Sequence, residues 1–570
     1  MNQCSVAPVA IYPTPMEVTR GHARVDLSRV NLAGDLAAYA DRLAKKGAVA
    51  DANGLPVRAE LRPLTELSYG ADEGYVLTLS EDGVKIAAET PRGVHYGMVT
   101  LLQLIGADAT CPAVTVKDAP RNALRGVIEG FYGVPWTHEY RKELYAFMGD
   151  NKLNAYIYAP KDDPKHRETW RTPYTDAELE RMGDLVATAR EHHVKFIYAI
   201  SPGCDYMNEE RAYESEFGLL LDKCRQIYDL GVRDFAIFLD DIPPAKLDSR
   251  LHARMLNEFQ TEFVKTHEGT SNLIAITPEY CDAFLTAYTD EIAPLIREDI
   301  VLMWTGVGVS PFYNCNETLG RIAEKYDRQV LIWWNYPVND YATRNLFMDA
   351  CGNLAQDIYK TTLGLIANPM NQGYASMIPM FTVSDFLWNP DVYDRAASLE
   401  AACRTFMPDA SEALLGFIRM TCANVINGDT DSVELKGLLD AFGESNTAKT
   451  RADLTAYFES MIQNADAILA SENQKMVAEL GDWLAKYRAY AEMGAAYIAM
   501  EEACATGQSA DAIRTLAERY RAVQQSLAEN NRIVSGPVVP TMDVNGKPSG
   551  NGVLMPFFDG LDARLETLQN

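Results

Sequence analysis

Eight short apolar runs, separated by stretches with helical periodicity, constrain the fold of this chain more than any other feature. The runs are at residues 126–128, 155–158, 194–200, 235–239, 273–276, 301–304, 330–333 and 363–367. Apolar runs without polar alternation are typical of strands covered on both faces of a parallel sheet. Eight strand and helix units in this span predict an α/β protein with a central (β/α)8 TIM barrel, a fold of about 250 residues. A doubly wound open sheet is the alternative.

Different patterns flank the barrel segment. Near the N-terminus, an alternating run at 75–80, a turn at 81–83 and a returning run at 84–88 predict a hairpin, and a helix is expected at about 94–104. Beyond about residue 395, apolar residues recur at helical spacing in the segments 411–426, 452–470, 473–503 and 510–530. We therefore expect three domains: an N-terminal α/β domain at 1–120, a catalytic barrel at 121–394 and a C-terminal helical bundle at 395–570.

The charge of the chain argues against polyanionic partners. Lys and Arg number 52 against 79 Asp and Glu, which gives a net charge of -27 and repels phosphate backbones and anionic membrane surfaces. No apolar stretch approaches the ~18 to 20 residues that a spanning helix needs. We expect a soluble protein that binds no nucleic acid and inserts into no membrane. Its first residues lack the pattern of a secretory signal, which leaves the compartment open. We expect a bacterial protein that is exported with a signal absent from this chain, and a cytoplasmic protein is the alternative.

The ten cysteines are scattered, with no CxxC pair and no Cys and His cluster at metal-ligand spacing. We interpret them as small buried apolar residues, because the count is low for a disulfide framework in a chain of this length. Their redox state and the number of subunits stay open. The sequence predicts no metal site and no cofactor.

Polar, aromatic and glycine residues gather directly after the strands. In chain order, the segments that follow the eight runs contain Glu129-Gly130-Phe131-Tyr132-Gly133, Pro160-Lys161-Asp162-Asp163, Pro202-Gly203, Asp240-Asp241, Pro278-Glu279-Tyr280, Thr305-Gly306, Trp334-Asn335 and Asn368-Pro369. Packing explains this composition poorly, because the stability of a barrel comes from its apolar layers. Since active sites of parallel barrels lie at the carboxyl ends of the strands, we expect these residues to surround one site.

The pair Asp240-Asp241 is the strongest candidate for chemistry. It follows the fourth run, and two carboxylates held close together do not both ionise easily, so one can act as an acid while the other stays charged. This division of roles is typical of glycosidic bond cleavage. Taken alone, the pair is also compatible with a helix cap or a cation site, and a second pair, Asp162-Asp163, occurs in the chain.

Four of these motifs together resemble glycoside hydrolase family 84, which contains bacterial β-N-acetylglucosaminidases and protein O-GlcNAcases. The motifs are Glu129-Gly130-Phe131-Tyr132-Gly133, Tyr158-Ala159-Pro160-Lys161-Asp162-Asp163, Leu239-Asp240-Asp241-Ile242 and Trp333-Trp334-Asn335. The resemblance implies a retaining exo-β-N-acetylglucosaminidase that releases terminal GlcNAc from a glycan or glycoprotein without a metal or cofactor. The 2-acetamido oxygen of the substrate would attack the anomeric carbon and form an oxazoline, the substrate-assisted exception to the two-carboxylate scheme.

The same resemblance assigns roles to individual residues. Asp240 would orient and stabilise the acetamido N–H, and Asp241 would protonate the leaving oxygen and then take a proton from water. The implied substrate-binding residues are Gly130 for close backbone approach, Lys161 for a ring hydroxyl, Tyr280 for the acetamido oxygen, Trp333 as a pocket wall, and Asn335, Asp340 and Asn368 for the remaining hydroxyls or the acetamido group. Taken one by one, these residues are equally compatible with a turn glycine, a solvated lysine, core aromatics, turn residues and a helix N-cap.

Three alternative functions stay open at this point. A non-catalytic carbohydrate-binding barrel would keep the aromatic walls but would not need both Asp240 and Asp241. An endo-acting, hyaluronidase-like hydrolase would cut inside a glycan chain. A metal-dependent barrel hydrolase would need His or carboxylate ligands on several strand ends, whereas this rim offers mainly Lys, Tyr, Asn and Trp.

Overall fold

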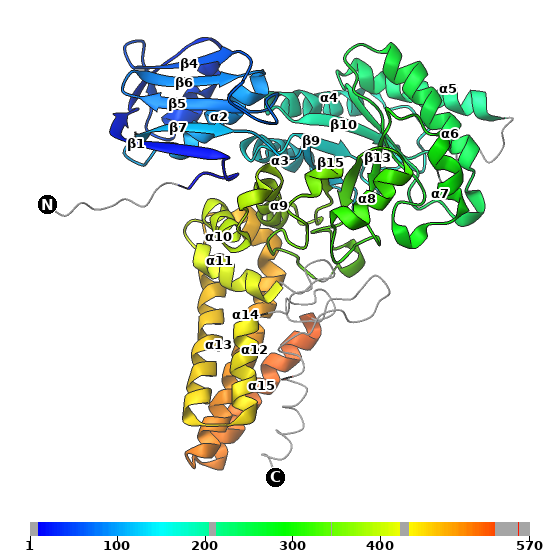
Figure 1. The fold of residues 1–570 in the computed structure, drawn as a ribbon. Helices are drawn as coiled ribbons and strands as arrows, with labels where there is room; N and C mark the ends of the chain where they lie inside the picture. The colour runs from blue at the N-terminus through cyan, green and yellow to red at the C-terminus, as the bar shows by residue number, and fades with distance from the viewer. Residues whose placement is uncertain (1–9, 204–211, 344, 422–431, 531–556, 558–570) are drawn as a thin grey trace.

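A closed barrel of eight parallel strands lies beside the N-terminal sheet and above the C-terminal helices in the view of Figure 1. The computed structural model describes residues 10–203, 212–343, 345–421, 432–530 and 557. Each barrel strand pairs with the next along the chain, and the last strand pairs with the first in parallel. This closure confirms the predicted TIM barrel, because an open sheet would leave two unpaired edges.

The eight predicted runs all form barrel strands. They are β8 (Leu124–Glu129), β9 (Ala155–Tyr158), β10 (Lys195–Ile200), β11 (Asp234–Phe238), β12 (Ile274–Ile276), β13 (Val301–Trp304), β14 (Val330–Trp334) and β15 (Thr362–Ala367). The helices around them are α3 (His138–Asp150), α4 (Asp176–Glu191), α5 (Tyr213–Asp229), α6 (Ser249–Glu258), α7 (Ala287–Ile292), α8 (Asn316–Lys325) and α9 (Gly373–Trp388).

Burial on both faces explains the apolar composition of these strands. Ile128, Ile157 and Phe238 belong to the cluster that fills the barrel interior. The residues that precede two of them, Val127 and Tyr156, belong instead to the larger cluster that includes side chains of the surrounding helices. Because successive side chains of a strand point to opposite faces, both faces must be apolar, and no polar alternation remains to be seen in the sequence.

The segment between β14 and β15 departs from the expected alternation. In its described residues, 335–343 and 345–361, it contains 3-10 turns at Asp340–Ala342 and Ile358–Lys360 and no α-helix. Leu346, Phe347 and Met348 are consecutive and all buried. Three successive residues of a helix point about 100° apart and rarely share one buried face, so tertiary packing sets the path of this segment.

A seven-stranded sheet precedes the barrel, in the order β1-β7-β5-β6-β4-β2-β3. Its strands are β1 (Glu17–Asp26), β2 (Arg29–Leu32), β3 (Val49–Ala50), β4 (Leu55–Leu61), β5 (Tyr75–Ser80), β6 (Gly83–Ala88) and β7 (Thr110–Asp118), with helices α1 (Ala40–Ala44) and α2 (Pro91–Leu104). The predicted hairpin is confirmed, since β5 and β6 are antiparallel with Ser80 opposite Gly83. The helix expected at about 94–104 is α2.

Helices dominate the chain after the barrel, as expected, and extend from it as an elongated bundle (Figure 1). They are α10 (Arg395–Phe406), α11 (Ser411–Ile418), α12 (Val433–Glu444), α13 (Ala448–Leu469), α14 (Gln474–Ala505) and α15 (Ala510–Asn530). The helix predicted at 411–426 ends at Ile418 and continues as a 3-10 turn to Thr421, and residues 422–431 lie outside the described part. The domain limits at 120 and 394 stay a prediction.

None of the helices in the described part of the chain combines the length and the apolar composition of a membrane span.

A buried polar cluster joins the N-terminal sheet to the barrel. Asp118, at the end of β7, accepts hydrogen bonds at Oδ2 from Lys152 Nζ (2.8 Å) and Tyr75 Oη (2.7 Å), and at Oδ1 from Trp388 Nε1 (2.7 Å). The side chains of Lys152 and Asp118 are fully buried. An ionised carboxylate at such a site is tolerated only because it is paired and hydrogen-bonded.

Loss of this cation should weaken the junction strongly. We expect Lys152→Met to lower the free energy of unfolding by about 3 kcal/mol, because it leaves the Asp118 carboxylate buried without its counter-charge. Urea denaturation followed by tryptophan fluorescence measures the change, since Trp388 belongs to the cluster. The matched control is Lys436→Met, which removes an exposed pair with Asp440 and should cost less than about 0.5 kcal/mol. Equal effects of the two variants would contradict this account of the junction.

Candidate active site

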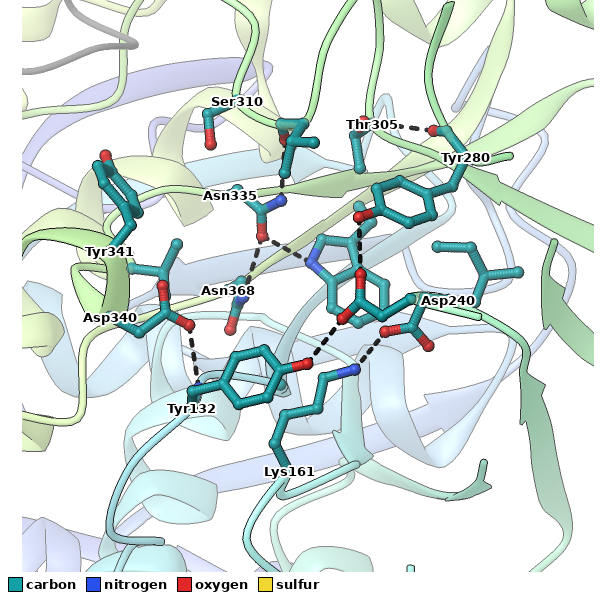
Figure 2. A pocket seen from close by; sticks show the side chains of 16 residues that line it. Tyr132, Lys161, Asp240, Tyr280, Thr305, Ser310, Asn335, Asp340, Tyr341 and Asn368 are labelled. Carbon is teal, nitrogen blue, oxygen red and sulfur yellow. Dashed lines mark hydrogen bonds and ion pairs between the residues drawn. The ribbon is translucent and has the colours of Figure 1, made fainter. Parts of the chain in front are cut away.

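A cavity of about 460 Å³ opens at the carboxyl ends of the barrel strands, within the size range of small-ligand sites. All nine residues singled out from the sequence line it, namely Gly130, Lys161, Asp240, Asp241, Tyr280, Trp333, Asn335, Asp340 and Asn368. The other lining residues are Tyr132, Ile276, Thr305, Val309, Ser310, Val338 and Tyr341. Figure 2 shows ten of these side chains labelled around the cavity.

The strands bring these residues together from distant parts of the sequence. Gly130 directly follows β8, Asn335 directly follows β14 and Asn368 directly follows β15. Lys161 and Tyr280 stand in the loops after β9 and β12. The site therefore has its polar groups on loops that a rigid barrel positions, the arrangement typical of active sites on this fold.

Asp240 is a buried carboxylate with one oxygen engaged and one unpaired. Its Oδ2 forms an ion pair with Nζ of Lys161, which is also buried, and the two side chains meet in Figure 2. Its Oδ1 is buried and has no hydrogen-bond partner among the described residues. Burial favours the neutral form of Asp240, but the charges of Lys161 and Arg167 outweigh this effect and hold the pKa of the carboxyl below its ordinary value. An ionised oxygen is thus available to a donor in the cavity.

Asp241 has different surroundings, although it is the next residue. Its backbone is left-handed, with φ of 59°, an uncommon conformation outside glycine that Asp tolerates better than most residues. Its Oδ1 accepts from Tyr280 Oη (3.0 Å) and its Oδ2 from Tyr132 Oη (2.7 Å). The side chain is 37% exposed, so Asp241 reaches both the cavity and the solvent.

Tyr132 links three charged groups at the rim. Besides donating to Asp241, its hydroxyl accepts a hydrogen bond from Arg167 Nη1 (2.8 Å), and its backbone N–H donates to Asp340 Oδ2 (3.0 Å). Partial burial raises the pKa of Tyr132 to about 12, so the phenol stays protonated. Burial also raises the pKa of Asp340 above its ordinary value.

Trp333 forms a wall of the cavity and depends on its neighbours for its position. A Cβ on Gly130 would lie 2.9 Å from the Trp333 ring, so glycine lets the ring approach the backbone there. The indole Nε1 donates to Asn335 Oδ1 (2.9 Å), which also accepts from Asn368 Nδ2 (3.0 Å). Asn368 keeps a buried Oδ1 without a partner among the described residues, so Asn368 can accept from a ligand while Asn335 orients it.

Some residues of the site carry no role in the sequence-based prediction. Tyr132 lies inside a quoted motif, next but one to Gly130, and this closeness is the signal that could have identified it. Arg167 follows Lys161 by six residues in an irregular loop, and no spacing rule points to it. Asp163 belongs to the framework, since it accepts from Tyr158 Oη (2.8 Å). Across the described residues, no group of three or more His, Cys, Asp or Glu could hold a metal ion.

The chain matches known protein families in three consecutive regions. Residues 125–419 match the family described as β-N-acetylglucosaminidase. Residues 9–119 match domain 2 of glycosyl hydrolase family 20, and residues 434–541 match a hyaluronidase post-catalytic domain-like family.

Individual proteins are similar to parts of the chain. Protein O-GlcNAcase of Mus musculus is 32% identical over 293 residues, which are 49% of this chain and 31% of the mouse protein. Beta-hexosaminidase subunit B2 of Dictyostelium discoideum is 29% identical over 184 residues, 27% of this chain and 32% of that protein. The chain thus spans about a third of the length of these curated relatives.

Solved structures are similar over most of the chain. The structure of CpGH84B superposes with a TM-score of 0.85 at 30% identity and covers 97% of this chain and 100% of that one. A mutant of the O-GlcNAc hydrolase of Thermobaculum terrenum has a TM-score of 0.67 at 23% identity and covers 79% of this chain and 94% of its own. At 23% identity, the similarity to the Thermobaculum terrenum protein shows a shared fold only.

His166 lies on the same loop as Lys161. Its ring is fully buried, and Nδ1 lies 2.8 Å from the carbonyl oxygen of Ala199. Because a carbonyl only accepts, Nδ1 carries the proton of the neutral ring. Burial and the nearby Lys161 charge lower the pKa of His166 from 6.5 to about 4.

This neutral histidine should make stability depend on pH. Between pH 6.5 and about 4 the unfolded chain binds a proton at His166 that the folded chain does not, so folding loses about 1.4 kcal/mol per pH unit as the pH falls. We expect His166→Asn to remove this component, so that its melting temperature falls less than that of the wild type between pH 6.5 and 4.5. His22→Asn, at an exposed site, is the control; a variant that falls as steeply as the wild type would contradict the prediction.

Proposed function

The chain belongs to the β-N-acetylglucosaminidase family, and from this membership and the geometry of its cavity we propose that it is a retaining exo-β-N-acetylglucosaminidase. In this proposal the barrel at 121–394 is the catalytic domain, and the substrate is a terminal GlcNAc of a glycoprotein or glycan. The membership agrees with the resemblance to glycoside hydrolase family 84 drawn from the motifs. One observation carries the proposal: adjacent carboxylates have opposite surroundings, Asp240 ionised against buried Lys161 and Asp241 at the rim between two phenols.

The first step uses both carboxylates and the substrate's own acetamido group. The unpaired Oδ1 of Asp240 accepts the acetamido N–H and stabilises the positive charge that develops there. The acetamido oxygen then forms a bond to the anomeric carbon while the bond from that carbon to the leaving oxygen breaks. Asp241 gives its proton to the leaving oxygen and becomes a carboxylate. The products are the alcohol and an oxazoline in its N-protonated form, the oxazolinium ion, whose N–H remains hydrogen-bonded to the Asp240 carboxylate.

The second step reverses the proton transfer. A water molecule enters at the mouth, where Asp241 is partly exposed, and gives one proton to the Asp241 carboxylate. Its oxygen bonds to the anomeric carbon as the bond to the oxazoline oxygen breaks, which restores the acetamido group. Two inversions at one carbon give overall retention.

The walls of the cavity support the preference for terminal sugars. Trp333 closes one side, the Asn335 amide accepts from its indole, and the Asn368 amide donates to Asn335. Asn368 Oδ1 offers an acceptor to a sugar hydroxyl. The resemblance implies that Lys161 contacts a ring hydroxyl. Because Lys161 pairs with Asp240, we add to this proposal a second role, in which Lys161 keeps that carboxylate ionised.

Release of GlcNAc from an aryl β-GlcNAc glycoside tests the proposal, with the first anomer formed read by proton NMR. We expect the β-anomer to appear first. An O-GlcNAc peptide, a mucin-type glycan and hyaluronan, assayed side by side, separate the substrate classes. An α-anomer would contradict retention, and shortened hyaluronan without free GlcNAc would favour the endo-acting alternative. No release from any substrate would favour the non-catalytic barrel.

The role of Asp241 predicts a dependence on the leaving group. Asp241→Ala should lower the rate by about 10²- to 10⁴-fold on a substrate with a poor leaving group, which needs protonation, and far less on a nitrophenyl glycoside. Asp240→Asn is the matched comparison and should slow both substrates, because it weakens formation of the oxazoline itself. Steady-state kinetics measure both variants. Equal losses on the two substrates for Asp241→Ala would contradict its role as the acid.

A further inference from the structure

The C-terminal bundle is bonded to the barrel close to one of the cavity residues. Asn368 follows β15, and helix α9 begins a few residues later, at Gly373. In the first turn of α9, the backbone N–H of Ala375 donates to Oε2 of Glu479 (2.9 Å), a residue of the bundle helix α14. This contact links the bundle to the segment that carries Asn368.

Glu479 supplies a cap that α9 lacks within its own segment. The first N–H groups of a helix have no partner inside the helix, and the side chain of Gln372, the residue before α9, makes no capping hydrogen bond. Burial raises the pKa of Glu479, and the N–H groups of Gly373, Tyr374 and Ala375 oppose that rise. The start of α9 is thus fixed by a carboxylate of another domain, the charge that the positive end of a helix dipole favours.

Residues 371–373, which we call the anchor segment, are bonded to the loop after β8. The carbonyl oxygen of Asn371 accepts from Trp136 Nε1 (3.1 Å), and Asn371 Nδ2 donates to the carbonyl oxygen of Val134 (3.1 Å). Gly130 and Tyr132, which line the cavity, belong to the same loop. The anchor segment therefore holds this loop at two points just beyond Tyr132.

The anchor segment is also bonded to the loop after β14. Gln372 Oε1 accepts from Nδ2 of the buried Asn339 (3.0 Å), and the next residue, Asp340, lines the cavity. One short segment is thus bonded to the loops after β8 and β14, and it is continuous with the loop after β15 that contains Asn368.

The same three loops are bonded to one another on the side of the cavity. The backbone N–H of Tyr132 donates to Asp340 Oδ2 (3.0 Å), and the N–H of Val338 donates to the carbonyl oxygen of Asn368 (2.8 Å). Because the loops are joined at both levels, a shift of the anchor segment should move the cavity residues together.

We propose that the C-terminal bundle positions the substrate-binding loops, with Glu479 as the positioning residue that fixes the anchor segment. This inference rests on the proposed function, in which Asn368 and Asp340 bind the sugar. Their contacts to sugar hydroxyls are made in the ground state and in the transition state alike. Poorer placement of these residues therefore raises KM and leaves kcat little changed.

Glu479→Met tests this role, because it keeps the length of the side chain and removes its acceptor oxygens. We expect KM for an aryl β-GlcNAc glycoside to rise about fivefold, a factor typical of the loss of one helix cap, with kcat nearly unchanged. The inhibition constant of free GlcNAc should rise by the same factor. Glu479→Gln keeps one acceptor oxygen and should recover most of the loss. Steady-state kinetics well below the melting temperature of each variant measure these changes.

Glu501→Met is the matched control, since it makes the same substitution in the same helix. Glu501 is buried in the bundle and accepts from Tyr497 Oη (2.6 Å) and Asn446 Nδ2 (2.7 Å). Its loss should lower the melting temperature without raising KM, because it leaves the contact between Glu479 and Ala375 in place. A purely structural role of Glu479 would give the same result as this control.

Hydrogen exchange of the wild type provides a second measurement that needs no variant. Coupling between two sites is reciprocal, so saturation with GlcNAc should slow exchange at the N–H of Ala375 by about the same fivefold factor, although Ala375 does not line the cavity. The start of α10 is the control. Asp394 caps that helix within its own segment by accepting from the N–H of Ala397, and exchange there should not change.

The outcomes distinguish this inference from the proposed function. Unchanged KM and inhibition constants in a folded Glu479→Met variant would overturn the inference, as would an equal rise of KM in Glu501→Met. If Glu479→Met does not fold, unaltered exchange at Ala375 on GlcNAc binding overturns it. A wild type that releases no GlcNAc contradicts the proposed function instead, and the exchange measurement, which needs no turnover, still tests the link between cavity and bundle.

Discussion

The hydrogen bonds between β15 and β8 are the constraint on which the rest of the molecule depends. They join the last barrel strand to the first, and because all eight strands run parallel, their carboxyl ends form a single rim. Gly130 and Asn368 follow these two strands and so become neighbours in the site. The chain of contacts from Trp333 through Asn335 to Asn368 links the ends of β14 and β15 along the same rim. Closure of the barrel thus determines which residues share the site, whatever their individual chemistry.

Closure alone does not make two adjacent aspartates different. The difference comes from burial and backbone direction. Asp240 pairs inside the protein with Lys161, and a buried ion pair of this kind contributes little net stability, because desolvation offsets most of the attraction. The pair instead keeps Asp240 ionised, with its Oδ1 available to a hydrogen-bond donor in the cavity. Asp241 adopts a left-handed backbone, which costs roughly 1 to 3 kcal/mol for a residue other than glycine, and its side chain then lies at the mouth between two phenols.

Much of this architecture follows from sequence pattern, and the exceptions have physical causes. The barrel strands were predictable because burial on both faces leaves uninterrupted apolar runs, and the rim residues because they directly follow those runs. The irregular segment around Leu346 was not, since its apolar residues are buried by tertiary packing without helical spacing. Arg167 was also not predictable from the sequence. It stands in an irregular loop, and sequence patterns carry no information on the direction of a single long side chain. The roles of the nine cavity residues stay predictions that rest on the resemblance and the geometry.

The partners of the two aspartates suggest a general distinction between a fixed and a changing charge. Lys161 can only donate, so its contact with Asp240 suits one protonation state of that carboxyl. A phenol can donate or accept, so Tyr132 and Tyr280 can remain bonded to Asp241 whether or not it carries a proton. A guanidinium in direct bidentate contact would abolish that freedom by stabilising the anion too strongly. Arg167 is one step removed, bonded to Tyr132 and 3.9 Å from the carboxylate, so its contact with Asp241 passes through a phenol that can either donate or accept.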